Sequence, residues 1–143
     1  MMPQSLSKFG LIVAVEDLCD DINFGDQMEV TFQHFNVDNS KLSIINLPVY
    51  RMIQELLNNI VKHAQATEVT VQLSQNDDAL LITVEDNGKG FDLETSLQKK
   101  GHGLSNLSSR VKALNGQVDF DSRINEGTSV SIQLPLNLEE RNA

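Results

Sequence analysis

The chain has 143 residues, of which 40% are hydrophobic and 22% are charged, and this composition is typical of one soluble globular domain. The formal net charge of −9 argues against nucleic acid as a partner and against direct membrane contact by this domain. Cys19 is the single cysteine, which excludes a disulfide framework and favours a reducing, cytoplasmic setting. No apolar run approaches the roughly 20 residues needed to span a bilayer, so we expect a cytoplasmic domain, which leaves a membrane-anchored parent open.

The first half of the chain predicts two helices with a strand between them. In residues 6–22, Leu11, Val15, Leu18 and Ile22 recur at helical spacing, so one helix is expected there, ending near Asp20 and Asp21. Alternating residues 28–35 predict a strand, and residues 37–41 predict a turn. A helix is expected over residues 47–65, with an apolar stripe made of Ile53, Leu56, Leu57, Ile60, Val61 and Ala64.

The second half predicts two hairpins with a helix between them. Residues 68–74 and 79–86 flank a polar turn, which is typical of an antiparallel hairpin. Residues 103–116 predict an amphipathic helix closed by Asn115 and Gly116. Residues 117–122 and 128–136 predict the last hairpin. This mixed order predicts an α/β two-layer sandwich, with helices on one face of a mixed sheet.

Two polar residues are expected at the rim of the core. Alternation puts Asp86 on the same strand face as Leu80, Ile82 and Val84. A carboxylate there is costly unless it finds a donor, although Asp-Asn-Gly is also ordinary turn chemistry, so Asp86 alone is as well explained as a turn cap. Thr128 begins a similar strand and is expected at the same boundary, where a β-former is unremarkable by itself.

Two further groups of residues suggest binding sites for a metal ion and an anion. Glu55, Asn59 and His63 form a polar stripe on the helix, with Lys62 close by. An acid, an amide oxygen and a cation suit Mg²⁺ and a phosphate, although a solvated helix flank has the same composition. Gly101 and Gly103 lead directly into a helix, whose first backbone N–H groups are able to bind an anion, although glycines also simply start helices.

Four segments together resemble a known family. They are residues 55–64 (ELLNNIVKHA), 86–92 (DNGKGFD), 101–111 (GHGLSNLSSRV) and 127–136 (GTSVSIQLPL). In this order they resemble the N, G1, G2 and G3 boxes of the GHKL ATP-binding superfamily, and more narrowly the catalytic domain of sensor histidine kinases of the nitrate-sensor and membrane-fluidity-sensor branch. The resemblance implies that residues 1–22 are the end of a dimerisation helix, a linker and the first helix, and that residues 23–143 are the ATP-binding catalytic domain.

The resemblance also implies a role for each motif residue, with ATP and Mg²⁺ as cofactors. Asp86 would accept a hydrogen bond from the adenine amino group, and Gly88 and Gly90 would let the backbone pass close to the base. Asn59 would be the Mg²⁺ ligand, and Glu55 a polarising residue or general base that reaches the metal through water. The remaining expected cofactor-binding residues are Lys62, His63, Gly101, His102, Gly103, Leu104 and Thr128.

The sequence departs from the family pattern in ways that bear on function. The lid between Phe91 and Gly101 is short, and none of the three histidines (His34, His63 and His102) is followed by the acid typical of a phosphoacceptor. We therefore expect the γ-phosphoryl acceptor on a dimerisation domain outside this chain, and a response regulator downstream. Three alternatives stay open: an anti-sigma-factor-like regulatory serine kinase, a clamp ATPase that needs a following domain, and a nucleotide sensor without transfer activity.

Overall fold

The computed structural model describes residues 3–25, 27–90 and 104–136. Its five-stranded sheet has the order β1-β2-β3-β5-β4. The pair β1–β2 is parallel, and the pairs β2–β3, β3–β5 and β4–β5 are antiparallel. The strands are β1 (Glu29–Phe35), β2 (Glu68–Gln75), β3 (Ala79–Asp86), β4 (Gln117–Arg123) and β5 (Gly127–Pro135). The sheet is therefore mixed, as predicted.

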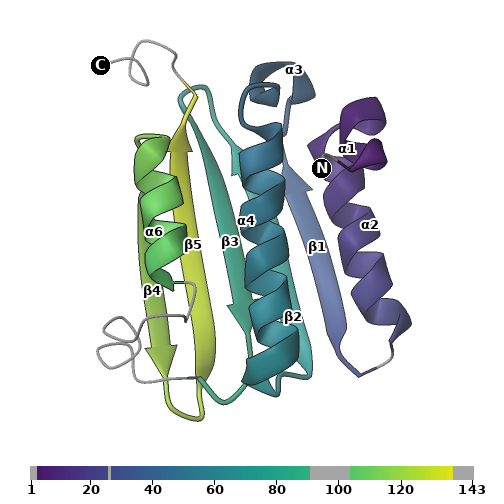
Figure 1. Ribbon diagram of the computed structural model, residues 1–143, viewed down its shortest axis with the longest axis vertical. Coiled ribbons are helices and arrows are strands. Elements are labelled where there is room, and N and C mark those ends of the chain that lie inside the picture. The colour runs from purple at the N-terminus through teal and green to yellow at the C-terminus, as the bar shows by residue number, and fades with distance from the viewer. Residues whose placement is uncertain (1–2, 26, 91–103, 137–143) are drawn as a thin grey trace.

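Helices cover one face of this sheet (Figure 1). They are α1 (Gln4–Phe9), α2 (Leu11–Phe24), the short α3 (Asn39–Leu42), α4 (Asn46–Asn59) with the π-helix η1 (Ile60–Ala64), and α6 (Leu104–Ala113). The arrangement confirms the predicted α/β two-layer sandwich. Among the described helices, none combines the length and the apolar character that a bilayer crossing requires.

The hydrophobic core lies between the helices and the sheet. Helix α4 buries five residues at i, i+3, i+4, i+7 and i+8, namely Val49, Met52, Ile53, Leu56 and Leu57. The facing strand residues Val71, Ile82 and Ile132 have no exposed surface. Each fully buried aliphatic side chain contributes roughly 1.5–3 kcal/mol relative to an exposed one, so the apolar stripe holds α4 to the sheet.

Both predicted hairpins are present, β2–β3 and β4–β5. Strands β3 and β5 are neighbours in the sheet, and their register pairs Asp86 with Thr128. The fold thus brings the beginnings of two separate sequence motifs together at one end of the two central strands.

Two local predictions in the first half are wrong. The N-terminal helix is interrupted at Gly10, whose φ of +89° suits glycine and where a Cβ would overlap the Asn39 side chain. After this break α2 runs on to Phe24, beyond the expected end near Asp20 and Asp21. Residues 37–41 are not a simple turn, because the Asp38 carboxylate accepts the Ser40 N–H at 3.0 Å and caps α3.

The helix predicted over residues 47–65 changes type near its end. It is α-helical to Asn59 and then widens into η1, before Gln65 adopts a left-handed conformation. The wider turn removes Val61 from the predicted buried stripe: Val61 is 53% exposed, whereas Ile60 is 8% exposed. Single π-turns of this kind are frequent at functional sites.

The N-terminal helices contribute to the same core as the rest of the chain. Leu6 of α1 and Leu11 and Val15 of α2 are buried within it. The predicted boundary between residues 22 and 23 falls inside α2. The division into a linker and a catalytic domain stays a prediction.

Candidate functional site

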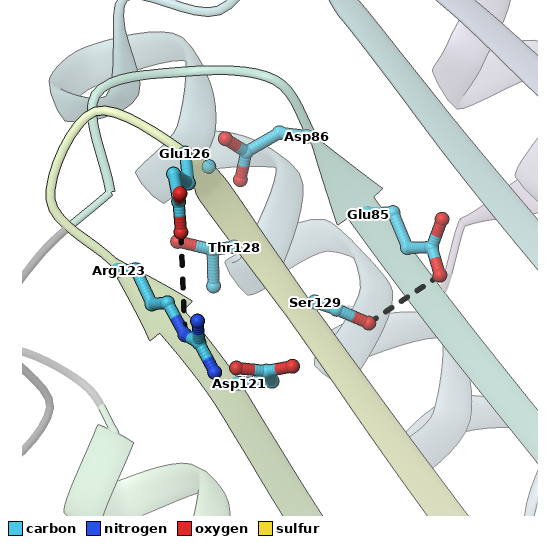
Figure 2. A pocket seen from close by; sticks show the side chains of 8 residues that line it. Glu85, Asp86, Asp121, Arg123, Glu126, Thr128 and Ser129 are labelled. Carbon is cyan, nitrogen blue, oxygen red and sulfur yellow. Dashed lines mark hydrogen bonds and ion pairs between the residues drawn. The ribbon is translucent and has the colours of Figure 1, made fainter.

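The candidate site lies where β3 ends. Asp86 is the last residue of β3, is half-buried, and shares its strand face with Val84, which is 2% exposed. Thr128 stands opposite Asp86 in register on β5 (Figure 2). The predicted placement of both side chains at the rim of the core is confirmed.

The Asp86 carboxylate is held by its own loop. Its Oδ1 accepts the Gly88 backbone N–H at 2.8 Å. Burial raises the pKa of Asp86 above its usual value, and backbone hydrogen bonds from Gly88 and Thr128 act in the opposite direction. Asp86 is therefore a turn cap, but an ionised carboxylate offers about four acceptor positions, so this role leaves acceptor capacity for a ligand.

The Thr128 side chain contacts the neighbouring strand β4. Its hydroxyl lies 2.8 Å from the Ser122 hydroxyl on β4. Thr128 supports Asp86 through its backbone, while its side chain is tied to the neighbouring strand.

The two glycines of the loop after β3 are required by close packing. A Cβ at Gly88 would overlap the carbonyl oxygen of Ala64, at the end of η1. A Cβ at Gly90 would overlap the carbonyl oxygen of Arg123, and Gly90 also has a φ of +62°. The loop therefore passes between the end of η1 and the β4–β5 turn, with no room for side chains at either position.

The backbone of Lys89 bonds to both neighbours. Its N–H donates to the Ala64 carbonyl at 2.7 Å, and its carbonyl accepts the Asn125 N–H. These bonds fix the loop relative to η1 and to the β4–β5 turn. The bond from the Lys89 N–H also satisfies the carbonyl that the π-helical end leaves free at Ala64.

Asn87 was not among the predicted site residues. Its Oδ1 accepts the backbone N–H groups of Thr67 and Glu68 at 2.9 and 3.0 Å, and its Nδ2 donates to the Thr67 hydroxyl at 2.9 Å. Asn87 thus joins the loop after β3 to the start of β2. Its position between Asp86 and Gly88 was the only signal in the sequence.

Helix α4 and η1 carry the second group of predicted residues. Glu55 and Asn59 lie one α-helical turn apart, and both are half-buried. Lys62 and His63 are exposed in η1. Glu55 and Asn59 therefore lie at i and i+4 of one α-helix, as predicted, whereas Lys62 and His63 lie in the π-helical turn and do not continue the regular α-helical spacing.

Helix α6 adds a residue that sequence reasoning missed. Arg110 Nη1 donates to Glu55 Oε2 at 2.8 Å, which joins α6 to α4. Leu104 is the first residue of α6, while Gly101, His102 and Gly103 lie outside the described residues.

A hollow of about 370 Å³ opens beside Asp86 and Thr128 (Figure 2). Its outer part carries the carboxylates of Glu85, Asp121 and Glu126, with Arg123 4.0 Å from Glu126. Like charges repel, so this hollow is unsuited to a phosphate. Lys62 and Arg110, in contrast, lie on the helical layer.

The described residues contain no group of three or more His, Cys, Asp or Glu side chains that could hold a metal ion. Glu55 and Asn59 nevertheless offer two oxygen donors on one helix face. Mg²⁺ characteristically takes one or two protein oxygens and completes its shell with phosphate oxygens and water. The donor set fits a magnesium ion that arrives with a phosphorylated ligand.

Comparison with known proteins agrees with this arrangement. Residues 45–138 match the family model described as histidine kinase-, DNA gyrase B-, and HSP90-like ATPase. The chain is 31% identical over 141 residues to the signal transduction histidine-protein kinase/phosphatase DegS of Bacillus subtilis, covering 95% of the chain and 37% of that protein. It is 31% identical over 142 residues to the sensor protein VraS of Staphylococcus aureus, covering 98% of the chain and 40% of that protein.

Solved structures show the same fold. The histidine kinase domain of the blue-light-activated histidine kinase EL346 of Erythrobacter litoralis superposes with a TM-score of 0.66 at 22% identity, covering 88% of this chain and 61% of that one. The histidine kinase AdeS of Acinetobacter baumannii superposes with a TM-score of 0.64 at 17% identity, covering 87% and 64%.

The chain spans 37% of the length of DegS and 40% of the length of VraS. The narrower assignment to the nitrate-sensor and membrane-fluidity-sensor branch stays a prediction. The family model covers well over half of the chain, and its boundaries enclose α4, Asp86 and Thr128. The chain therefore belongs to the family of histidine kinase-, DNA gyrase B- and HSP90-like ATPases.

Proposed function

We propose that this chain is the ATP-binding catalytic domain of a sensor histidine kinase, and that it binds Mg·ATP between the loop after β3 and the α4–η1 helix. The observation that carries the proposal is Asp86. It is a half-buried carboxylate at the end of a core strand, oriented by the Gly88 N–H at 2.8 Å and with acceptor capacity left. An acceptor of this kind matches the exocyclic amino group of adenine.

The helical layer would hold the phosphates. Asn59 would supply an oxygen to Mg²⁺, and Glu55 would bond to a water in the metal's shell. Lys62 and His63 lie within four residues of Asn59 and are exposed, so they are available to phosphate or ribose oxygens. Gly101, His102, Gly103 and Leu104 would complete this side as backbone donors at the start of α6.

The chemistry of phosphoryl transfer demands little covalent participation from the protein. Bound ATP supplies the γ-phosphoryl group, and catalysis is mainly positioning and charge stabilisation. In this scheme Asp86 and the loop behind it orient the base, and Asn59 and Lys62 hold and neutralise the phosphate end. Glu55 would polarise the reacting groups.

The acceptor histidine would belong to a dimerisation domain of the same parent protein. His34, His63 and His102 are followed by Phe, Ala and Gly, which is not an acceptor context. DegS and VraS are named as a histidine-protein kinase/phosphatase and a sensor protein, so we also propose a response regulator as the downstream partner. Because ATP is the proposed ligand and Cys19 is a free thiol, we propose that this domain of the parent protein lies in the cytoplasm.

Calorimetric titration of the chain with ATP and ADP, with and without Mg²⁺, tests the proposal. We expect saturable binding of both nucleotides that Mg²⁺ strengthens for ATP. The matched variants are Asp86→Asn, which alters the proposed base acceptor, and Asp121→Asn, which removes an exposed carboxylate from the same hollow. Absence of saturation at millimolar nucleotide, or equal loss of affinity in both variants, would contradict the proposal.

A further inference from the structure

An ion pair joins helices α4 and α6. Arg110 Nη1 lies 2.8 Å from Glu55 Oε2, across 55 positions of sequence. The Glu55 side chain is 28% exposed and the Arg110 side chain is 52% exposed. Figure 1 shows the two helices on the same face of the sheet. The pair therefore spans the space between them at the outer surface of the helical layer.

Buried neighbours set the direction of both side chains. Leu56 and Leu57 directly follow Glu55 and are 6% and 0% exposed. Leu107 and Val111 flank Arg110 on α6 and are 2% and 0% exposed. Because these residues anchor each helix to the core, neither helix can rotate freely. The geometry that brings Glu55 and Arg110 together is thus built into the packing.

This ion pair is a weak source of stability. Pairs between partly exposed side chains contribute about 0.2–1 kcal/mol, because solvent screens them and two long side chains lose freedom. Its larger effect is on orientation. A glutamate side chain has three rotatable bonds, and engagement of Oε2 by a guanidinium selects a small set of rotamers and leaves Oε1 available.

We propose that Arg110 is a positioning residue that holds the Glu55 carboxylate toward the Mg²⁺ shell at Asn59. Glu55 and Asn59 are i and i+4 on α4, so their Cβ atoms are about 5–6 Å apart. That separation suits a carboxylate bonded to a water on a metal that the amide oxygen ligates, because Mg–O distances are about 2.1 Å. The assignment rests on the proposed function, and it names a residue outside the binding set given above.

The test measures the gain in ATP affinity that Mg²⁺ provides, as the ratio of Kd in EDTA to Kd in saturating Mg²⁺. The variants are Arg110→Gln, Glu55→Gln, their combination, and the conservative Arg110→Lys. Lys112→Gln is the matched control, since it removes one positive charge from an exposed position of the same helix. ATP affinity in EDTA reports whether each variant is folded with an intact base site.

We expect Arg110→Gln and Glu55→Gln each to reduce the Mg²⁺ gain about tenfold, as loss of an orienting partner does at metal sites. The double variant should lose no more than either single one, because the two residues act as a unit. Arg110→Lys should recover most of the gain, since the contact uses one nitrogen, and Lys112→Gln should keep all of it. Affinity in EDTA should stay unchanged in Arg110→Gln, Arg110→Lys and Lys112→Gln.

Two outcomes would contradict the role assigned to Arg110, and only the second would also contradict the proposed function. If the variants bind ATP and Arg110→Gln keeps the full Mg²⁺ gain, or if the losses multiply in the double variant, Arg110 is a structural clamp alone. If the unmodified chain binds no ATP in either condition, the proposed function fails and the assignment falls with it.

Discussion

The backbone N–H of Gly88 donates to the Asp86 carboxylate at 2.8 Å, so the loop that follows β3 folds back on the last side chain of that strand. Gly88 is in turn pressed against the Ala64 carbonyl at the end of η1. The orientation of Asp86 therefore depends on the α4–η1 helix as well as on its own strand. This relationship connects the two motif regions that we propose to bind the base and the phosphates.

The partial burial of Asp86 predicts that its contribution to the free energy of unfolding depends on pH. Burial holds the pKa of Asp86 above its usual value of 3.8, so the folded chain binds this proton more tightly than the unfolded chain. Stability contributed at this residue is then lost as pH rises from about 3.8 through the raised pKa. Asp86→Asn removes that loss, and we expect it to be more stable than the unmodified chain near neutral pH, with an advantage that shrinks toward about pH 4.

Urea unfolding of both proteins at about pH 7 and about pH 4 measures this difference. Asp121→Asn, an exposed position on the outer face of the sheet, is the control for loss of one negative charge. A stability advantage of Asp86→Asn that is equal at both pH values, or absent at neutral pH, would contradict the account.

The close packing of the loop predicts a large effect of one methyl group. Gly88→Ala would drive a Cβ into the Ala64 carbonyl oxygen, and we expect a loss of about 1–3 kcal/mol, as for overpacked sites. The control is Gly25→Ala, where φ is −71° and the nearest atom to the new Cβ is 3.4 Å away. That variant should change stability by less than about 1 kcal/mol. Thermal or urea unfolding measures the stability of the two variants. Equal stability of Gly88→Ala and Gly25→Ala would contradict the close packing of this loop against Ala64.

Much of the fold could be predicted because its signals are local. Alternating residues 68–74 and 79–86 around a polar turn identify a hairpin, and the same alternation assigns Asp86 to the core face. The helical spacing of the apolar residues in α4 identifies the face that it buries. In each case the side-chain period alone decides which residues are inside.

The features that were missed depend on contacts between distant segments. The break at Gly10 reflects contact with Asn39, and the role of Asn87 depends on bonds to Thr67 and Glu68. The Glu55–Arg110 pair joins two helices that are separated by a hairpin. Periodicity describes one segment at a time, so it carries no information about such pairs.

Asn59 is predicted to serve the metal and not the base. Asn59→Ala should weaken ATP binding in Mg²⁺ by about tenfold or more while leaving binding in EDTA unchanged, because a lost ligand costs metal affinity. The neighbouring Asn58 is exposed on the same helix, so Asn58→Ala is a matched control that should behave like the unmodified chain. Calorimetry in both conditions gives the comparison. Unchanged Mg²⁺ dependence in Asn59→Ala would remove it from the proposed metal site.

The isolated chain is predicted not to phosphorylate itself. With γ-labelled ATP we expect no acid-labile, base-stable label on the chain, because none of its three histidines has an acceptor context. Addition of a separate dimerisation fragment from the parent protein should produce label on that fragment. Label on His34, His63 or His102 would contradict the proposed division of labour.

Discrimination between adenine and guanine tests the role of Asp86. An ionised carboxylate accepts hydrogen bonds only, so it pairs with the adenine amino group but faces the carbonyl oxygen of guanine. A buried acceptor left unpaired costs about 1–3 kcal/mol, which corresponds to roughly 10- to 100-fold in affinity. Asp86→Asn should reduce the difference in affinity between ATP and GTP, because the asparagine amide can turn its NH₂ toward the guanine oxygen. Glu85→Gln, next in sequence but on the outer face, should leave that difference unchanged.

The most direct measurement is competition of ATP and GTP for a bound fluorescent nucleotide on the unmodified chain. The account predicts that ATP displaces it at a concentration at least about tenfold lower than GTP. Equal displacement by the two nucleotides would mean that Asp86 caps its turn and does not read the base, and it would contradict the account.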